Sequence, residues 1–230
     1  MSTEPLPPDP EQIIAPTPPS RRRVLGMAAG VILVVVAVVL CLRIIFKPEA
    51  PTETAVTGLP VLGDPKAPLT IFEYASFACE HCAHVQPIVK EVMSRYEGKV
   101  KLVYIHYVLG SMSNHLRAAQ AGICAAEQGK FWEFEQIMFE RQKSWVQDAN
   151  PLPLWLLYAS QVGMDTNKLT RCMDSEATQQ ALQQQIMMGA GQMVQRTPTF
   201  LIGNTPLVNP GSVNDFVRVI DKELAALKKG

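Results

Sequence analysis

The segment FEYASFACEHCAHVQPIV, residues 72–89, joins a strand-like run to a helix-like run through two cysteines in a C-x-x-C spacing. The strand-like part, 68–77, combines β-branched and aromatic residues, and the apolar residues that follow Cys82 recur at helical spacing. Strand character returns at 100–109. Strand, helix and strand in this order predict a βαβ unit with a partly parallel sheet, and they put Cys79 at the carboxyl edge of the first strand.

The remainder of this region predicts a block of helices and then a return to strands. Residues from about 114 to 195 are rich in Ala, Leu, Gln and Met, with breaks at Gly and Pro. Two strand-like stretches, 197–203 and 205–208, precede an amphipathic helix at 212–227. The sequence therefore predicts an α/β domain over residues 61–230, with a helical insertion at about 114–195.

The N-terminal part of the chain has a different composition. Residues 1–23 are rich in proline and end in three arginines, which predicts a disordered tail. Residues 24–42 carry no charge, and as a helix they would span about 28 Å, close to the ~30 Å core of a bilayer. We expect a transmembrane helix at 24–46 and a linker at 47–60. A cleaved signal peptide is the alternative, although its apolar core is usually about 7–15 residues.

Charge sets the expected orientation and excludes one class of partner. The arginines before the predicted span place the N-terminus in the cytoplasm and the C-terminal domain outside it, by the positive-inside rule. The whole chain carries 21 basic and 21 acidic side chains, so no basic surface indicates binding of nucleic acid. Cysteines outside the cytoplasm can remain oxidised.

The C-x-x-C motif has several possible chemistries. Attachment of a c-type haem requires C-x-x-C-H, and Ala83 occupies the histidine position. A structural zinc site needs further ligands, and no second closely spaced pair is present. A C-x-x-C beside a βαβ pattern is typical of a redox centre. Metal binding and a purely structural disulfide remain alternatives, and we expect no metal and no cofactor besides a redox-active Cys79–Cys82 disulfide.

Position within the helix assigns different roles to the two cysteines. Cys79 is expected at the helix N-terminus, where free N–H groups and the helix dipole favour the thiolate, so it is the predicted nucleophile. Cys82 lies one turn further along the helix and is the predicted resolving thiol.

The segment FEYASFACEHC, the TPTFLIG segment and the helical block between them resemble the DsbA-type thiol:disulfide oxidoreductases of the thioredoxin fold. The resemblance covers roughly residues 58–227 and implies a thioredoxin-like core with an inserted helical domain. The predicted N-terminal anchor is an addition to the usual soluble form of that family.

The resemblance also implies roles for residues around the motif. His81 occupies the position of a histidine that stabilises the thiolate, whereas Glu80 replaces the family's proline and adds negative charge, which predicts a weaker oxidant. Glu73 matches a buried acid that exchanges a proton with the resolving cysteine. Pro198 matches a cis-proline facing the active site, and with Thr197 it would bind substrate backbone.

Two further cysteines lie in the predicted helical insertion. Cys124 and Cys172 form a candidate structural disulfide. Two buried free thiols are the alternative.

These observations together predict a membrane-anchored thiol:disulfide oxidoreductase that acts as an oxidant. We expect a single-pass protein of the bacterial inner membrane with its C-terminal domain in the periplasm or at the cell exterior. Its expected partners are exported proteins with thiols, a membrane or periplasmic redox partner and the lipid bilayer. A disulfide isomerase or reductase is one alternative, and a non-catalytic thioredoxin-like module for metal handling or binding is another.

Overall fold

The computed structural model describes residues 32–39, 51, 58–110 and 113–228. Residues 32–39 form a helix of apolar side chains that are largely exposed, and this segment is considered by itself. The predicted tail at 1–23 and most of the predicted span and linker lie outside the described residues. Within the described part of the chain, no helix is both long enough and apolar enough to cross a membrane.

The C-terminal unit is built on a five-stranded sheet with the order β1-β3-β2-β4-β5. The strands are β1 (Val61–Gly63), β2 (Leu69–Ala75), β3 (Val100–His106), β4 (Thr199–Ile202) and β5 (Thr205–Val208). β2 and β3 run parallel, as expected for a βαβ unit, and every other pair is antiparallel. The edge strands are short: β1 has three residues, and β5 has four with Pro206 among them.

Two helices complete the thioredoxin-like core around this sheet. They are α2 (Glu80–Arg95) and α9 (Val213–Leu227), which bury Val85, Val89, Phe216 and Ile220 in one cluster with sheet residues. α2 continues across Pro87 as one helix.

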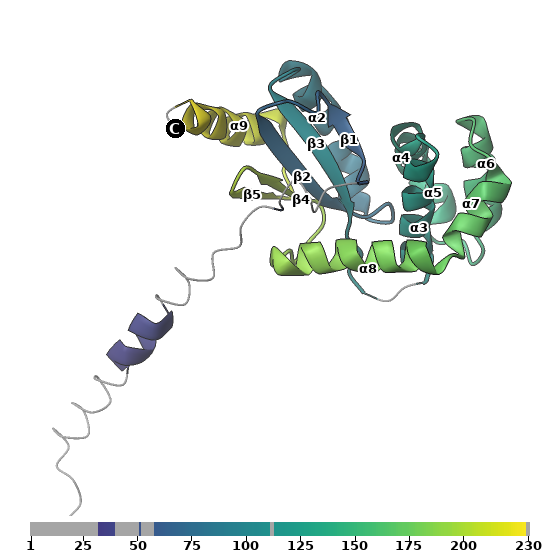
Figure 1. Ribbon diagram of the computed structural model, residues 1–230, viewed down its shortest axis with the longest axis horizontal. Coiled ribbons are helices and arrows are strands. Elements are labelled where there is room, and N and C mark those ends of the chain that lie inside the picture. The colour runs from purple at the N-terminus through teal and green to yellow at the C-terminus, as the bar shows by residue number, and fades with distance from the viewer. Residues whose placement is uncertain (1–31, 40–50, 52–57, 111–112, 229–230) are drawn as a thin grey trace, which may run out of the picture. The chain divides into compact units, whose positions relative to one another are not determined.

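The remaining helices form the insertion between β3 and β4, and Figure 1 shows α3–α7 grouped to one side of the sheet. Their bounds are α3 (Ser113–Glu127), α4 (Phe131–Glu140), α5 (Gln142–Trp145), α6 (Leu152–Gln161), α7 (Thr166–Met173) and α8 (Glu176–Gly191). α8 runs back from this group toward the sheet (Figure 1), and its Gln185 Oε1 accepts a hydrogen bond from the His106 N–H at 2.7 Å. The predicted insertion at about 114–195 agrees with these helices.

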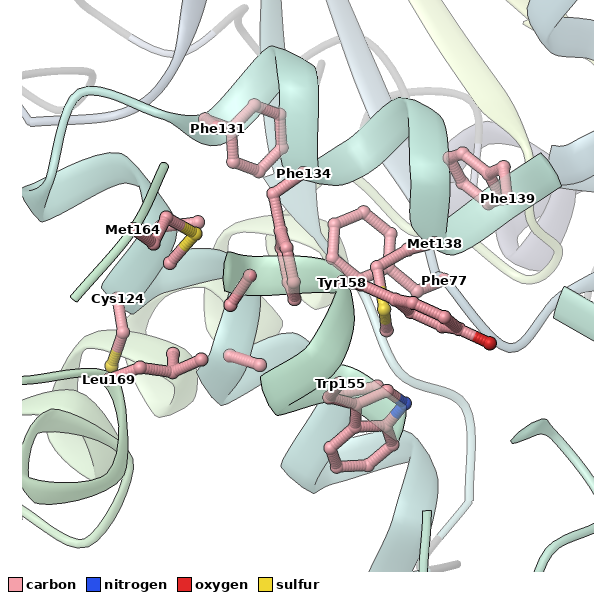
Figure 2. Packing of buried hydrophobic residues seen from close by; sticks show 14 of the residues in the cluster. Phe77, Cys124, Phe131, Phe134, Met138, Phe139, Trp155, Tyr158, Met164 and Leu169 are labelled. Carbon is pink, nitrogen blue, oxygen red and sulfur yellow. The ribbon is translucent and has the colours of Figure 1, made fainter. Parts of the chain in front are cut away.

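The largest hydrophobic cluster lies where the insertion meets the loop after β2. Phe77 is buried there, with ring centroids 5.4 Å from Phe139 and 6.3 Å from Phe134. Figure 2 shows Phe77 near side chains of α4 in this cluster. Fully burying an aromatic side chain of this kind contributes about 1.5–3 kcal/mol, so this cluster fastens the loop before Cys79 to the helical domain.

The strand boundaries expected from sequence were partly wrong. β2 ends at Ala75, not at residue 77, and β3 ends at His106, not at residue 109. In both places the apolar residues that continue the pattern are buried in a loop: Phe77 packs on α4, and Tyr107 donates a hydrogen bond from its hydroxyl to the Val194 carbonyl. Burial therefore extends past the carboxyl ends of β2 and β3 into the loops that follow them.

Candidate active site

The candidate active site begins at the turn that joins β2 to α2. The Cys79 N–H donates to the Ser76 carbonyl at 3.0 Å, which closes a turn over Phe77 and Ala78. Cys79 then takes the N-cap position of α2, with an extended backbone, and its carbonyl accepts from the Ala83 N–H at 3.2 Å. This places its side chain at the end of the helix where backbone N–H groups have no partner within the helix.

The surroundings of Cys79 favour its thiolate. Its pKa is lowered from 9.0 to about 5, first by a hydrogen bond from the Cys82 thiol. The hydroxyl of Thr197 and the backbone N–H groups of Cys82 and His81 lower it further, while partial burial acts in the opposite direction. The thiolate of Cys79 is therefore favoured at neutral pH, and its role as the nucleophile stays a prediction.

Cys82 has the opposite character. It is fully buried, and burial raises its pKa well above 9.0, with a further rise from its contact with the Cys79 sulfur. Both cysteines are free thiols in this structure. The pair therefore contains one sulfur that is ionised at neutral pH and one that keeps its proton.

The loop before β4 faces the nucleophile. The peptide bond between Thr197 and Pro198 is cis, as expected by resemblance. The Cys79 Sγ lies 3.3 Å from the Thr197 carbonyl oxygen, to which the thiol form donates. Residues 118 positions apart in the sequence thus meet at the reactive sulfur.

Glu73 lies behind the cysteines on β2 and is fully buried. Burial raises its pKa from 4.5 to about 8, and a 3.1 Å hydrogen bond from Gln86 Nε2 to its Oε1 opposes this rise. Glu73 contributes to the raised pKa of Cys82, so the two groups are electrostatically coupled. The expectation of a buried acid on this strand is confirmed.

The side chains between the cysteines contribute less than expected. His81 was predicted to stabilise the thiolate through its side chain, but that side chain is exposed, and its contribution comes from its backbone N–H. Glu80 is also exposed, in the first turn of α2. A solvated ring has little influence on a neighbouring charge, whereas a main-chain N–H has a fixed direction.

Cys124 on α3 and Cys172 on α7 form a disulfide, so this prediction is also correct. The disulfide links two residues that are 48 positions apart in the sequence, and both lie in the helical domain. It does not join the residues around Cys79.

Sequence reasoning missed several polar groups near this site. Glu135 on α4 is buried, and burial together with the charge of Glu73 raises its pKa. Tyr104, the register partner of Glu73 on β3, is fully buried, and its hydroxyl has no hydrogen-bond partner among the described residues. Gln142 on α5 contacts the carbonyls of Phe77 and Cys79. The only feature of the sequence that could have indicated a buried acid at Glu135 is its place in the aromatic run FWEFE. No feature of the sequence indicates a role for Gln142, because α5 has only four residues.

His115 on α3 was given no function from the sequence. The charge of Cys79 acts on it in the direction that raises its pKa, against a larger lowering by burial, so the two groups are near each other. Among the described residues, no group of three or more His, Cys, Asp and Glu side chains is arranged to hold a metal ion.

Comparisons with known proteins agree with this geometry. A family model described as Thioredoxin matches residues 55–222. The chain is 26% identical to disulfide bond formation protein D of Bacillus subtilis over 179 residues, covering 75% of this chain and 80% of that protein. It is also 30% identical to Na(+)/H(+) antiporter NhaA 3 of Salinispora tropica over 143 residues, 62% of this chain but only 21% of that protein.

The fold has solved counterparts. The crystal structure of oxidised BdbD from Bacillus subtilis aligns with a TM-score of 0.69 at 22% identity, covering 77% of this chain and 97% of that one. The expected resemblance to DsbA-type proteins is confirmed by these matches. The family model covers well over half of the sequence, and the chain therefore belongs to the thioredoxin family.

Proposed function

We propose that this protein is a membrane-anchored thiol:disulfide oxidoreductase that donates disulfides to exported proteins. The observation that carries the proposal is the difference between the two sulfurs of one C-x-x-C motif. Cys79 has a pKa of about 5 and lies against the Thr197 carbonyl, whereas Cys82 is buried with a raised pKa. A pair arranged in this way can bind a substrate covalently at Cys79 while Cys82 serves as the first leaving group.

The first half of the reaction begins with the Cys79–Cys82 disulfide. A substrate thiolate attacks Cys79 Sγ, a mixed disulfide forms, and the bond to Cys82 breaks. Cys82 leaves as a thiolate in a buried position that disfavours its charge, so it must take up a proton. Glu73, with a pKa of about 8, holds a proton at neutral pH and is placed to supply it.

The second half releases the product. A second thiolate of the substrate attacks the substrate's own sulfur in the mixed disulfide, and Cys79 leaves as a thiolate. The substrate dithiol has lost two electrons and two protons, and the enzyme now carries the dithiol. A redox partner at the membrane must remove those electrons before the next cycle. Because the low pKa of Cys79 stabilises the reduced enzyme, the equilibrium favours oxidation of the substrate.

The substrate is proposed to bind as an extended chain against the loop at Thr197 and Pro198. The backbone beside Pro198 faces Cys79, and an added strand there would bring a substrate cysteine to the sulfur. Main-chain hydrogen bonds do not depend on side chains, which suits an enzyme acting on many exported proteins.

Two activity assays test the reaction. The protein should catalyse reduction of insulin by dithiothreitol, and its oxidised form should restore activity to a reduced, unfolded test protein. Cys79→Ala should lose both activities. If Cys79→Ala retained them, the protein would not be this enzyme; if the native protein showed neither activity, the non-catalytic alternative would be correct. A redox potential measured against glutathione then separates an oxidant from a reductase or isomerase.

The proposed location has its own test. The charge-free run 24–42 and the preceding arginines support a single span with the catalytic domain outside the cytoplasm. In intact spheroplasts, a membrane-impermeant maleimide should label Cys79 of the full chain after mild reduction. Labelling only after lysis would place the domain in the cytosol and contradict the proposal.

A further inference from the structure

The turn before α2 leaves one backbone carbonyl that the turn itself cannot satisfy. In the turn Ser76–Cys79, the Ser76 carbonyl accepts the Cys79 N–H, so the Phe77 carbonyl points away from that bond. Phe77 is 1% exposed, which keeps water from this oxygen. A buried carbonyl without a donor is destabilising, so the fold must supply a donor from elsewhere.

Gln142 supplies that donor from the inserted helical domain. Its Nε2 donates to the Phe77 carbonyl at 2.6 Å and to the Cys79 carbonyl at 2.9 Å. Both partners only accept, so the two hydrogens of the amide are used and its nitrogen must face the loop. The side chain of Gln142 is itself buried.

The position of Gln142 is fixed by its own surroundings. It opens α5, where the Val146 N–H donates to its carbonyl at 2.9 Å. Trp145 of the same helix is fully buried and donates from Nε1 to the Met138 carbonyl at 2.9 Å. The amide therefore reaches the loop from a helix that is tied to α4.

We propose that Gln142 is a positioning residue of the redox reaction, which holds the carbonyls of Phe77 and Cys79 and so fixes the nucleophilic sulfur over the N-terminus of α2. Few side chains can replace it: Ser and Thr have one donor, Asn is shorter by one methylene, and Glu would face two carbonyls with an acceptor. The inference rests on the proposed function, because it assigns Gln142 a part in the same exchange reaction.

Loss of these two bonds should act on the sulfur in two ways. The loop can relax, which lengthens the contacts from the N–H groups of His81 and Cys82 to the Cys79 sulfur. The Phe77 carbonyl would also be left without a donor, so its oxygen dipole near the anion is no longer neutralised, whereas the Cys79 carbonyl keeps the Ala83 N–H. Both changes favour the thiol over the thiolate.

The other ionisable groups around Cys79 do not depend on Gln142. Cys82, His81 and Glu80 belong to α2, and Glu73 lies behind Cys82 on β2. His115 belongs to α3, and the charge of Cys79 acts on its pKa. A change in the ionisation of Cys79 on mutation of Gln142 therefore reports on the loop and not on a lost charge.

The test is the pH dependence of Cys79 alkylation by iodoacetamide in the reduced protein, followed by mass spectrometry. Gln142→Met removes both donors and keeps the length of the side chain. A rise of one unit in the pKa would lower the rate about fivefold at pH 5 and leave it nearly unchanged at pH 8. The matched control is Gln136→Met on α4, an exposed Gln whose amide donates to Glu140.

The outcomes separate this inference from the proposed function. A shifted profile in Gln142→Met alone supports the inference. An unshifted profile, or an equal shift in Gln136→Met, overturns it while the function stands. If native Cys79 itself titrated near pH 9, the proposed function would fail first. Should Gln142→Met not fold, Gln142→Asn keeps the amide but shortens its reach, and the same outcomes decide.

Discussion

The two cysteine pairs of this chain have similar chemistry and different surroundings. Cys79 and Cys82 are separated by two residues at the start of a helix, and both are free. Cys124 and Cys172 lie within two helices, and they are bonded to each other. The expected reactivity of a cysteine pair therefore depends on whether its sulfurs lie at a helix N-terminus and near a buried acid. The presence of two neighbouring cysteines is not sufficient. Four variants test how far this difference extends.

The largest effect is expected when the reactive pair loses its buried member. Cys82→Ala has no Cys79–Cys82 disulfide for a substrate thiolate to attack, so disulfide donation should fall by about three orders of magnitude or more. Its Cys79 thiolate can still attack a substrate disulfide, and because no Cys82 thiol can then release it, covalent complexes with substrate should accumulate on non-reducing gels. Normal turnover by this variant would mean that the disulfide partner of Cys79 comes from another molecule.

Removal of the Cys124–Cys172 disulfide should lower the stability of the fold and leave the redox reaction of Cys79 unchanged. Cys124→Ala combined with Cys172→Ala opens a loop with a sequence separation of 48 residues, which in the chain-entropy model costs about 4 kcal/mol. Urea unfolding measures this loss. The alkylation profile of Cys79 should be unchanged; a shifted profile would show that the two pairs are coupled.

Glu73→Gln should slow exchange and stabilise the fold at alkaline pH. Without a proton donor, release of Cys82 should slow about 10- to 100-fold at pH 7. Stopped-flow Trp fluorescence during reduction would follow that step.

The stability effect has a defined sign. Because the pKa of Glu73 is raised from 4.5 to about 8, its contribution to stability is present below pH 4.5 and lost as the pH rises through 8. Glu73→Gln removes this loss, so the free energy of unfolding should increase by about 1–3 kcal/mol at pH 8 and change little at pH 4. A variant less stable than the native protein at pH 8 would contradict a buried, protonated Glu73.

The smallest effect is expected from the exposed residue beside the nucleophile. Glu80→Gln removes a solvated negative charge near the thiolate, so the pKa of Cys79 should fall by about 0.2–0.5 units. The thiolate absorbance at 240 nm measures this change. The difference from native protein should disappear at about 1 M salt, where exposed charges are screened; a difference that persisted would place Glu80 in a protected position.

Local sequence patterns predicted much of this molecule. The βαβ unit, the position of Cys79 at the start of a helix and the helical insertion followed from spacing and composition. The cis peptide bond before Pro198 and the buried acid at Glu73 came from resemblance, because neither can be derived from local preferences. The Cys124–Cys172 disulfide was one of two alternatives, and only the fold brings those helices together.

What sequence reasoning missed depends on contacts across the domain boundary. Gln142 lies 63 positions from Cys79, and it begins a helix of four residues, too short for a periodic pattern. β1 has three residues at the edge of the predicted linker and was not recognised as a strand. The overextended ends at 77 and 109 arose because apolar residues in buried loops continue a strand pattern. The extent of the predicted tail, span and linker stays a prediction.

The sheet edges described above matter for a protein whose proposed clients are still unfolded. Exposed strand edges invite pairing with other chains. Here one outer strand has three residues, and the other contains Pro206, which has no N–H to offer. The edge strands therefore offer an unfolded polypeptide few backbone N–H and C=O groups for strand pairing. On the proposed function, this leaves the loop beside Pro198 as the place for substrate contact, and short edges would lower the risk that the enzyme is drawn into aggregates of its substrates.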